Sequence, residues 1–337
     1  MSAYVTQPPT GDRSAAAFWR RFAPRTVRIP RARVRTVLWV GLGAAALYVL
    51  LPQVGGLGDS LVALSGAQPG WIAAGLALVA VRYALAAVSL QAVVREPLAF
   101  WPTLLVQLAS SFVGRFTPEG LGWLVLNQRY LERSGIERAS GLAAITVKLV
   151  AGGLMRLLIA IGVAAMAAAS GVIRFEPPTP SGADVLVGGL TLAAAVGVAW
   201  AIRSRVPRVG AAVARAGRDL AAVLRQPDRA AVLLGSTAAL TVAYGLVLST
   251  SITAFGVGTD IVAVFAVYLG ATAVAALSPT PGNLGAIEVA LIAGLSAVGV
   301  PGPLAVTSVL LFRFLTFWLP VVPGFFAFRF LQNKGLL

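Results

Sequence analysis

Cysteine and histidine are both absent from this chain of 337 residues, and acidic residues are far fewer than basic ones. Without these two side chains there are no thiol nucleophiles, disulfides or Ser-His-Asp triads, and the usual zinc sites are excluded. The aspartates Asp59, Asp184 and Asp260 stand alone, which disfavours the paired carboxylates of a metal-dependent transferase. The chain also lacks the G-x-x-x-x-G-K-[ST] phosphate loop of ATPases. No cofactor or metal ion is expected, and enzymatic activity is not favoured.

Charged residues of both signs are scarce, and apolar residues dominate. The chain is 58% hydrophobic and only 12% charged, with a mean hydropathy of +0.85. A soluble domain is roughly half apolar and roughly one-quarter charged. The composition therefore predicts an integral membrane protein.

The net charge of +15 is concentrated in two basic segments. One is the N-terminal arm, residues 1–35, and the other is the stretch 203–229; both flank apolar runs. Such segments are typical of the cytoplasmic side of a membrane protein, where they also attract anionic lipid. No aromatic residues interleave with the basic residues of 203–229, so no nucleic acid partner is expected. The arm is expected to be disordered and to precede a retained membrane span, because it is too long and arginine-rich for an ordinary secretory signal.

Apolar runs of about 20 residues predict an all-α polytopic membrane protein with about eight long transmembrane helices and two short broken helices. The long spans are expected near residues 37–51, 71–90, 98–113, 139–169, 185–202, 230–254, 261–277 and 304–330. The short helices are expected near residues 121–131 and 284–298. Together they form a single transmembrane domain over residues 36–332, followed by a cytoplasmic tail, 333–337.

The placement of charge tests whether the short helices cross the membrane. With the arm inside and every segment counted as a crossing, the basic stretches 129–138 and 203–229 and the tail all fall inside. If the short helices were re-entrant, the arginines of 203–229 would be exported, against the positive-inside rule. We therefore expect crossing short helices and cytoplasmic termini at both ends.

A hexapeptide occurs twice within this apolar sequence, as TPEGLG at 117–122 and as TPGNLG at 280–285. Proline and glycine at membrane depth free backbone groups that lipid cannot hydrogen-bond, so such breaks persist only where protein or water surrounds them. An odd number of crossings separates the two breaks, so the repeat halves, about 98–170 and 261–332, are expected to be inverted. Inverted repeats with a binding site near the membrane midplane are typical of secondary transporters.

Several charged residues lie deep within the predicted spans. A charge at the centre of a span costs roughly 2.5–3.5 kcal/mol, so each needs a binding role or an ion-pair partner. Helices that restart after the breaks present free N–H groups and a positive dipole end, which suit phosphate or carboxylate. Glu288 is the candidate for resetting the site by protonation. The expected substrate-binding residues are Arg82, Thr117, Pro118, Gly120, Gly122, Lys148, Arg156, Thr280, Pro281, Gly282, Asn283, Gly285, Glu288 and Arg313.

Each of these residues also has a structural interpretation. The charges form ion pairs or reach toward the interface, and the prolines and glycines kink helices for packing. Some arginines are interpreted as interfacial charges, namely Arg115, Arg129 and Arg133. The second break has the fuller pattern, with Gly282 and Glu288, and is favoured as the binding half.

At this point the chain resembles a known family. The sequence 114–122 with Arg129-Tyr130-Leu131, and the sequence 279–288 with Arg313, resemble the flippase-like membrane domain of lysylphosphatidylglycerol synthases. The resemblance covers roughly 36–332 and implies an inner-membrane protein that moves or handles lipids and lipid-linked sugars. Glu119 stands where the family more often has glycine. Full-length synthases add a soluble aminoacyl-transferase domain; because this chain ends at Leu337, a stand-alone membrane domain is expected.

The favoured hypothesis is a flippase-type transporter of the cytoplasmic membrane that moves or binds an anionic phospholipid or a lipid-linked headgroup. A membrane-embedded transferase acting on a lipid-linked substrate is one alternative. The other is a non-transporting partner that anchors or activates a separate lipid-modifying enzyme through its basic segments. Anionic membrane lipids are the partners expected under the favoured hypothesis.

Overall fold

The computed structural model describes residues 66–115, 121–170, 220–276 and 283–337, and all regular structure in these ranges is helical. The described residues belong to one compact unit, Tyr48–Leu337. Within them, four helical stretches are long and apolar enough to cross a membrane: Pro69–Val93, Arg138–Ser170, Pro227–Thr253 and Gly302–Asn333. This confirms an all-α fold with several membrane-spanning helices. The spans expected at 37–51 and 185–202 lie outside the described residues, as do the N-terminal arm and most of 203–229.

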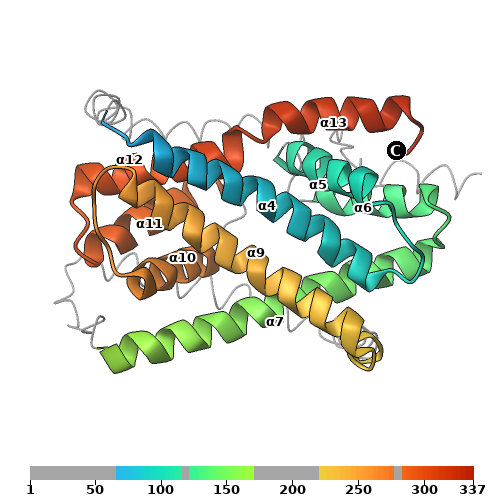
Figure 1. The fold of residues 1–337 in the computed structure, drawn as a ribbon, viewed down its shortest axis with the longest axis horizontal. Helices are drawn as coiled ribbons and strands as arrows, with labels where there is room; N and C mark the ends of the chain where they lie inside the picture. Colours follow the sequence, from blue (N-terminus) through green and yellow to red (C-terminus); the bar gives the residue numbers. More distant parts are fainter. Residues whose placement is uncertain (1–65, 116–120, 171–219, 277–282) are drawn as a thin grey trace, which may run out of the picture. The chain divides into compact units, whose positions relative to one another are not determined.

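The helices fall into two runs along the chain (Figure 1). The first run is α4 (Pro69–Val93), α5 (Phe100–Arg115), α6 (Leu121–Arg133) and α7 (Arg138–Ser170). The second run is α9 (Pro227–Thr253), α10 (Ile261–Ala275), α11 (Ala286–Ala297), α12 (Gly302–Arg313), the π-helix η3 (Phe314–Trp318) and α13 (Val321–Asn333). The span expected near 304–330 is therefore interrupted by a π-helix.

Helices α4 and α9 pack side by side and run antiparallel (Figure 1). At one end, the amide of Gln68 donates to the carbonyl of Ala254 at 2.8 Å, which joins the start of α4 to the end of α9. At the other end, the Arg229 guanidinium donates to the carbonyl of Val94, which joins the start of α9 to the end of α4. Both helices carry proline in the first turn, where its missing N–H has no intrahelical partner to lose.

Contacts between helices recur in equivalent pairs in the two runs. Helix α5 packs on α6 as α10 packs on α11, and α6 packs on α7 as α11 packs on α12. Helix α4 packs on α5 as α9 packs on α10. Between the runs, α7 contacts α10 as α13 contacts α5. Each helix of the first run thus has a counterpart in the second.

The two short helices α6 and α11 end in the same way. Gly135 and Gly299 follow them with φ of 85° and 89°, a backbone conformation that favours glycine. The next amide then reaches back by 3.0 Å in each case, from Ile136 to the carbonyl of Leu131 and from Val300 to that of Leu295. This is the Schellman arrangement, in which an apolar residue after the glycine packs against the last helical turn. The two breaks are therefore followed by the same local structure.

Helix α13 packs closely against α5 at Gly324. A Cβ added there would lie 2.7 Å from the backbone oxygen of Leu108 and 3.0 Å from Phe112 Cβ. Small residues at such crossings let membrane helices approach each other. We expect Gly324→Ala to lower the free energy of unfolding by about 1–3 kcal/mol, because a backbone oxygen cannot rotate away. Thermal unfolding in detergent measures the loss.

The control for this substitution is Gly235→Ala in α9, where no heavy atom lies within 4 Å of an added Cβ. This control is expected to be neutral or stabilising, because alanine favours a helix interior more than glycine does. Equal stability of the two variants would contradict the close α5–α13 contact.

Candidate functional site

A cavity of about 510 Å³ lies among helices α4, α5, α6, α7 and α9. Its walls carry four cationic side chains and a set of neutral polar ones. The cations are Arg82, Arg115, Lys148 and Arg156, and the neutral polar residues are Tyr83, Gln107, Ser110, Ser111, Thr237, Thr241 and Tyr244. None of the described residues that line the cavity is acidic. The cavity is therefore a strongly positive site within apolar helices.

Lys148 is held in place by polar groups of the neighbouring helices. Its Nζ donates to the carbonyl of Ala86 on α4 at 2.8 Å and to Gln107 Oε1 on α5 at 3.3 Å. The amide nitrogen of Gln107 donates in turn to Asn127 on α6 at 2.8 Å. These contacts use two of the three donors of the ammonium group, so one remains for a ligand.

Arg82 lies against aromatic rings and has no acidic partner among the described residues. Its guanidinium carbon is 3.9 Å from the ring centre of Tyr83 and 4.9 Å from that of Tyr244. Its Nε is buried without a hydrogen-bond partner in the part of the chain that the structure describes. Ring faces attract a cation but do not neutralise it, so this guanidinium retains its capacity for an anion.

Arg156 completes the set of expected cations at this cavity. It lies eight residues after Lys148 on α7, and both side chains line the same cavity beside Gly152 and Gly153. Arg156 is exposed, whereas Lys148 is buried. Three of the expected binding residues, Arg82, Lys148 and Arg156, therefore share one cavity.

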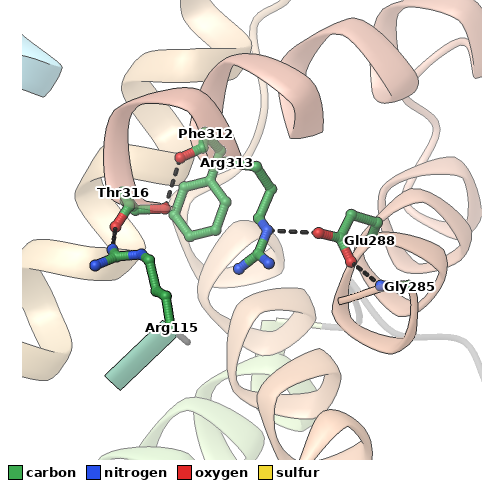
Figure 2. Close-up of polar contacts among 6 residues, drawn as sticks. All are labelled: Arg115, Gly285, Glu288, Phe312, Arg313 and Thr316. Atoms are coloured by element: carbon green, nitrogen blue, oxygen red, sulfur yellow. Dashed lines mark hydrogen bonds and ion pairs between the residues drawn. The ribbon is translucent and has the colours of Figure 1, made fainter. Parts of the chain in front are cut away.

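Arg313 and Glu288 form a separate, buried ion pair (Figure 2). Arg313 Nε lies 2.6 Å from Glu288 Oε1, and the two side chains are 9% and 6% exposed. The other carboxylate oxygen accepts a hydrogen bond from the amide of Gly285 at 2.7 Å. The carboxylate thus occupies the N-terminus of α11, where free N–H groups and the helix dipole favour negative charge. Neither residue lines the cavity.

The breaks are only partly described. Thr117, Pro118, Gly120, Thr280, Pro281 and Gly282 lie outside the described residues. Gly122 is the second residue of α6. Asn283 and Gly285 have φ of 56° and 86°, so the chain enters α11 through left-handed backbone.

Arg115 is a cavity residue that the sequence analysis had interpreted as an interfacial charge. It ends α5, and its Nη2 donates to the carbonyl of Thr316 in η3 at 2.8 Å. The signal that could have indicated its role is its position just before the first Thr-Pro break. The buried amides Gln107 and Asn127 were also missed, although polar side chains within apolar helices mark an interior site.

Several long apolar helices that surround a polar, positively charged cavity define a multi-pass α-helical membrane protein. The chain belongs to the family described as the lysylphosphatidylglycerol synthase TM region, whose model matches residues 37–324. This confirms the resemblance inferred from the sequence and associates the protein with lipid handling. No curated protein matches the chain significantly.

Proposed function

We propose that this protein is a flippase-type lipid transporter of the cytoplasmic membrane that binds the phosphate of an anionic lipid headgroup in the cavity. The observation that supports it most is the set of four cations at one cavity whose described lining residues include no acid. Arg313, by contrast, is paired with Glu288. Unpaired charges within a membrane domain are costly and mark substrate pathways. A phosphate would supply the missing negative charge through charge-assisted hydrogen bonds.

The rest of the cavity suits a headgroup rather than a bare ion. Hydroxyl side chains from α5 and α9 line it, including Ser110, Ser111, Thr237 and Thr241. These groups can donate to or accept from the hydroxyls of a glycerol or sugar headgroup. The volume of about 510 Å³ is that of a small-molecule site. In this proposal the acyl chains stay in the bilayer while the headgroup crosses through the cavity.

We propose further that the two helix runs are inverted repeats. The counterpart helices α4 and α9 run antiparallel, which is the relation that an inverted repeat requires. The recurring helix contacts and the matched glycine turns after α6 and α11 support the same relation. With the spans expected outside the described residues, the full domain has about eight long and two short helices and cytoplasmic termini. Rocking of one repeat against the other would expose the site to each side in turn.

Movement of fluorescent phosphatidylglycerol in proteoliposomes tests the transport proposal. We expect Lys148→Gln to slow this movement about tenfold or more, because a charge-assisted contact contributes about 1.5–3 kcal/mol. Phosphatidylcholine and a net-cationic lysyl ester of phosphatidylglycerol should move more slowly than phosphatidylglycerol. The matched control is Lys334→Gln, because Lys334 is exposed near the end of the chain. Equal movement by the wild type and Lys148→Gln would contradict the site assignment.

A further inference from the structure

Arg115 lines the cavity, yet its guanidinium bonds away from it, toward the second helix run (Figure 2). Nη2 donates to the carbonyl of Thr316 at 2.8 Å, and Nη1 donates to the carbonyl of Ser111 on its own helix. Nε is buried without a hydrogen-bond partner among the described residues. Both acceptors are neutral carbonyls, so this partly buried cation has no anion beside it in the part of the chain that the structure describes.

The carbonyl of Thr316 is available because of Pro320. Proline has no backbone N–H, so the residue four positions after Thr316 cannot supply the usual α-helical donor. The helical ladder changes here to the π pattern, in which the amide of Leu319 donates to the carbonyl of Phe314 at 2.8 Å. The Arg115 guanidinium thus replaces a missing backbone donor at the interruption between α12 and α13.

This contact belongs to a longer series that ends at the second break. The ring of Phe317 is contacted by both guanidiniums, with its centre 4.7 Å from Arg115 Cζ and 4.3 Å from Arg313 Cζ. Arg313 pairs with Glu288, which accepts the amide of Gly285 at the start of α11. A continuous series of contacts therefore joins the cavity wall to the helix that follows residues 277–282.

We propose that Arg115 is an additional phosphate-binding residue of the cavity, and that it transfers from the Thr316 carbonyl to a bound phosphate. An anionic acceptor forms a stronger, shorter hydrogen bond than a neutral carbonyl, so phosphate favours the transfer. The transfer leaves Thr316 without its donor and frees η3 to rearrange. Occupancy of the cavity thereby changes the interruption between α12 and α13. This inference rests on the proposed binding of a phosphate headgroup.

Binding of phosphatidylglycerol to the protein in phosphatidylcholine nanodiscs tests the transfer. We expect Arg115→Gln to weaken binding about tenfold, because it removes a charge-assisted contact. Pro320→Ala supplies an amide that can satisfy Thr316 and so compete with Arg115 for its carbonyl. It is expected to tighten binding about threefold, because the cation no longer has to leave a bonded state. Pro323→Ala, which changes the next proline of the same segment, should bind as the wild type does.

Two further arms keep the result interpretable. The double variant Arg115→Gln/Pro320→Ala restores a donor to Thr316, so weak binding by this variant cannot be attributed to an unsatisfied carbonyl. Glycerol phosphate, added to nanodiscs that contain only phosphatidylcholine, separates a soluble phosphate from a lipid headgroup. A response to both ligands supports the transfer with a phosphate from either source, and a response to the lipid alone assigns it to the headgroup.

A spin label reports the change at η3 directly. The chain has no cysteine, so Val322→Cys, at a side chain that is 60% exposed beside Pro320, accepts a single label. Phosphatidylglycerol is expected to increase the label's mobility in the wild-type and Pro323→Ala backgrounds. It should leave the label unchanged in the Arg115→Gln and Pro320→Ala backgrounds.

The outcomes separate this inference from the proposed function. If Arg82→Gln abolishes lipid binding while Arg115→Gln and Pro320→Ala bind and report as the wild type does, the transfer is wrong and the anion site stands. If the wild type binds neither phosphatidylglycerol nor glycerol phosphate in preference to phosphatidylcholine, both proposals are wrong.

Discussion

Replacing Glu288 by alanine is expected to lower the free energy of unfolding by about 3–5 kcal/mol. The substitution leaves Arg313 as a buried cation without its carboxylate partner, at 2.6 Å in the native pair. It also removes the acceptor of the Gly285 amide at the N-terminus of α11. Losing one partner of a buried pair is costly because the other charge stays desolvated. Thermal unfolding of the purified protein in detergent measures the effect.

Two companion variants identify the cause. Glu288→Gln keeps an acceptor for the Gly285 amide but removes the charge, so its loss should be smaller, about 1–3 kcal/mol. The double variant Glu288→Leu/Arg313→Met removes both charges and should recover most of the stability, because apolar pairs of similar volume replace buried ion pairs well. Stability of Glu288→Ala within about 0.5 kcal/mol of the wild type would contradict a structural ion pair.

The same variants test the hypothesis that Glu288 resets the site by protonation. A glutamine cannot exchange a proton, so a carboxylate with that role predicts that Glu288→Gln folds but no longer moves lipid. A purely structural pair predicts transport in proportion to the folded fraction, for Glu288→Gln and Arg313→Ala alike. Proteoliposomes reconstituted with equal amounts of folded protein distinguish these results.

The helices themselves could be predicted from the sequence because apolar run length and Pro/Gly positions determine them. The spans expected at 71–90 and 139–169 correspond to α4 and α7, with ends shifted by a few residues. The interruption at η3 could not be predicted in this way. Pro320 signals a missing donor, but the stabilising donor comes from Arg115, which is 201 residues from Thr316 in the sequence. Interactions at such separation depend on tertiary packing.

The site was predictable only in its chemistry. The insertion cost of a charge identified Arg82, Lys148 and Arg313 as residues that need a partner. It could not show that Arg313 has its partner in Glu288 whereas the other two face a cavity, because helix rotation and packing decide this. The fuller pattern of the second break favoured the second half for binding. The cavity instead lies beside α5, α6 and α7 of the first run, together with α4 and α9.

Replacing Arg82 by methionine is expected to have the opposite effect on stability from Glu288→Ala. The charge of Arg82 within the membrane domain costs about 2.5–3.5 kcal/mol. Its contacts with Tyr83 and Tyr244 return only about 0.5–2 kcal/mol. In phosphatidylcholine nanodiscs, Arg82→Met should therefore raise the free energy of unfolding by about 1 kcal/mol. A residue that is retained despite this cost is best explained by a ligand that it binds.

Phosphatidylglycerol distinguishes that ligand role from a mere defect of packing. A headgroup present at 100 times its dissociation constant stabilises the wild type by about 2.7 kcal/mol. Arg82→Met should lose most of this response, so adding the lipid reverses the order of stability of the two proteins. Arg138→Met is the control, because the Arg138 side chain is 81% exposed and its partner Glu132 is also at the surface. The control should keep the full response. If Arg82→Met keeps it as well, the cation does not bind the headgroup and the cavity loses its main support as the transport site.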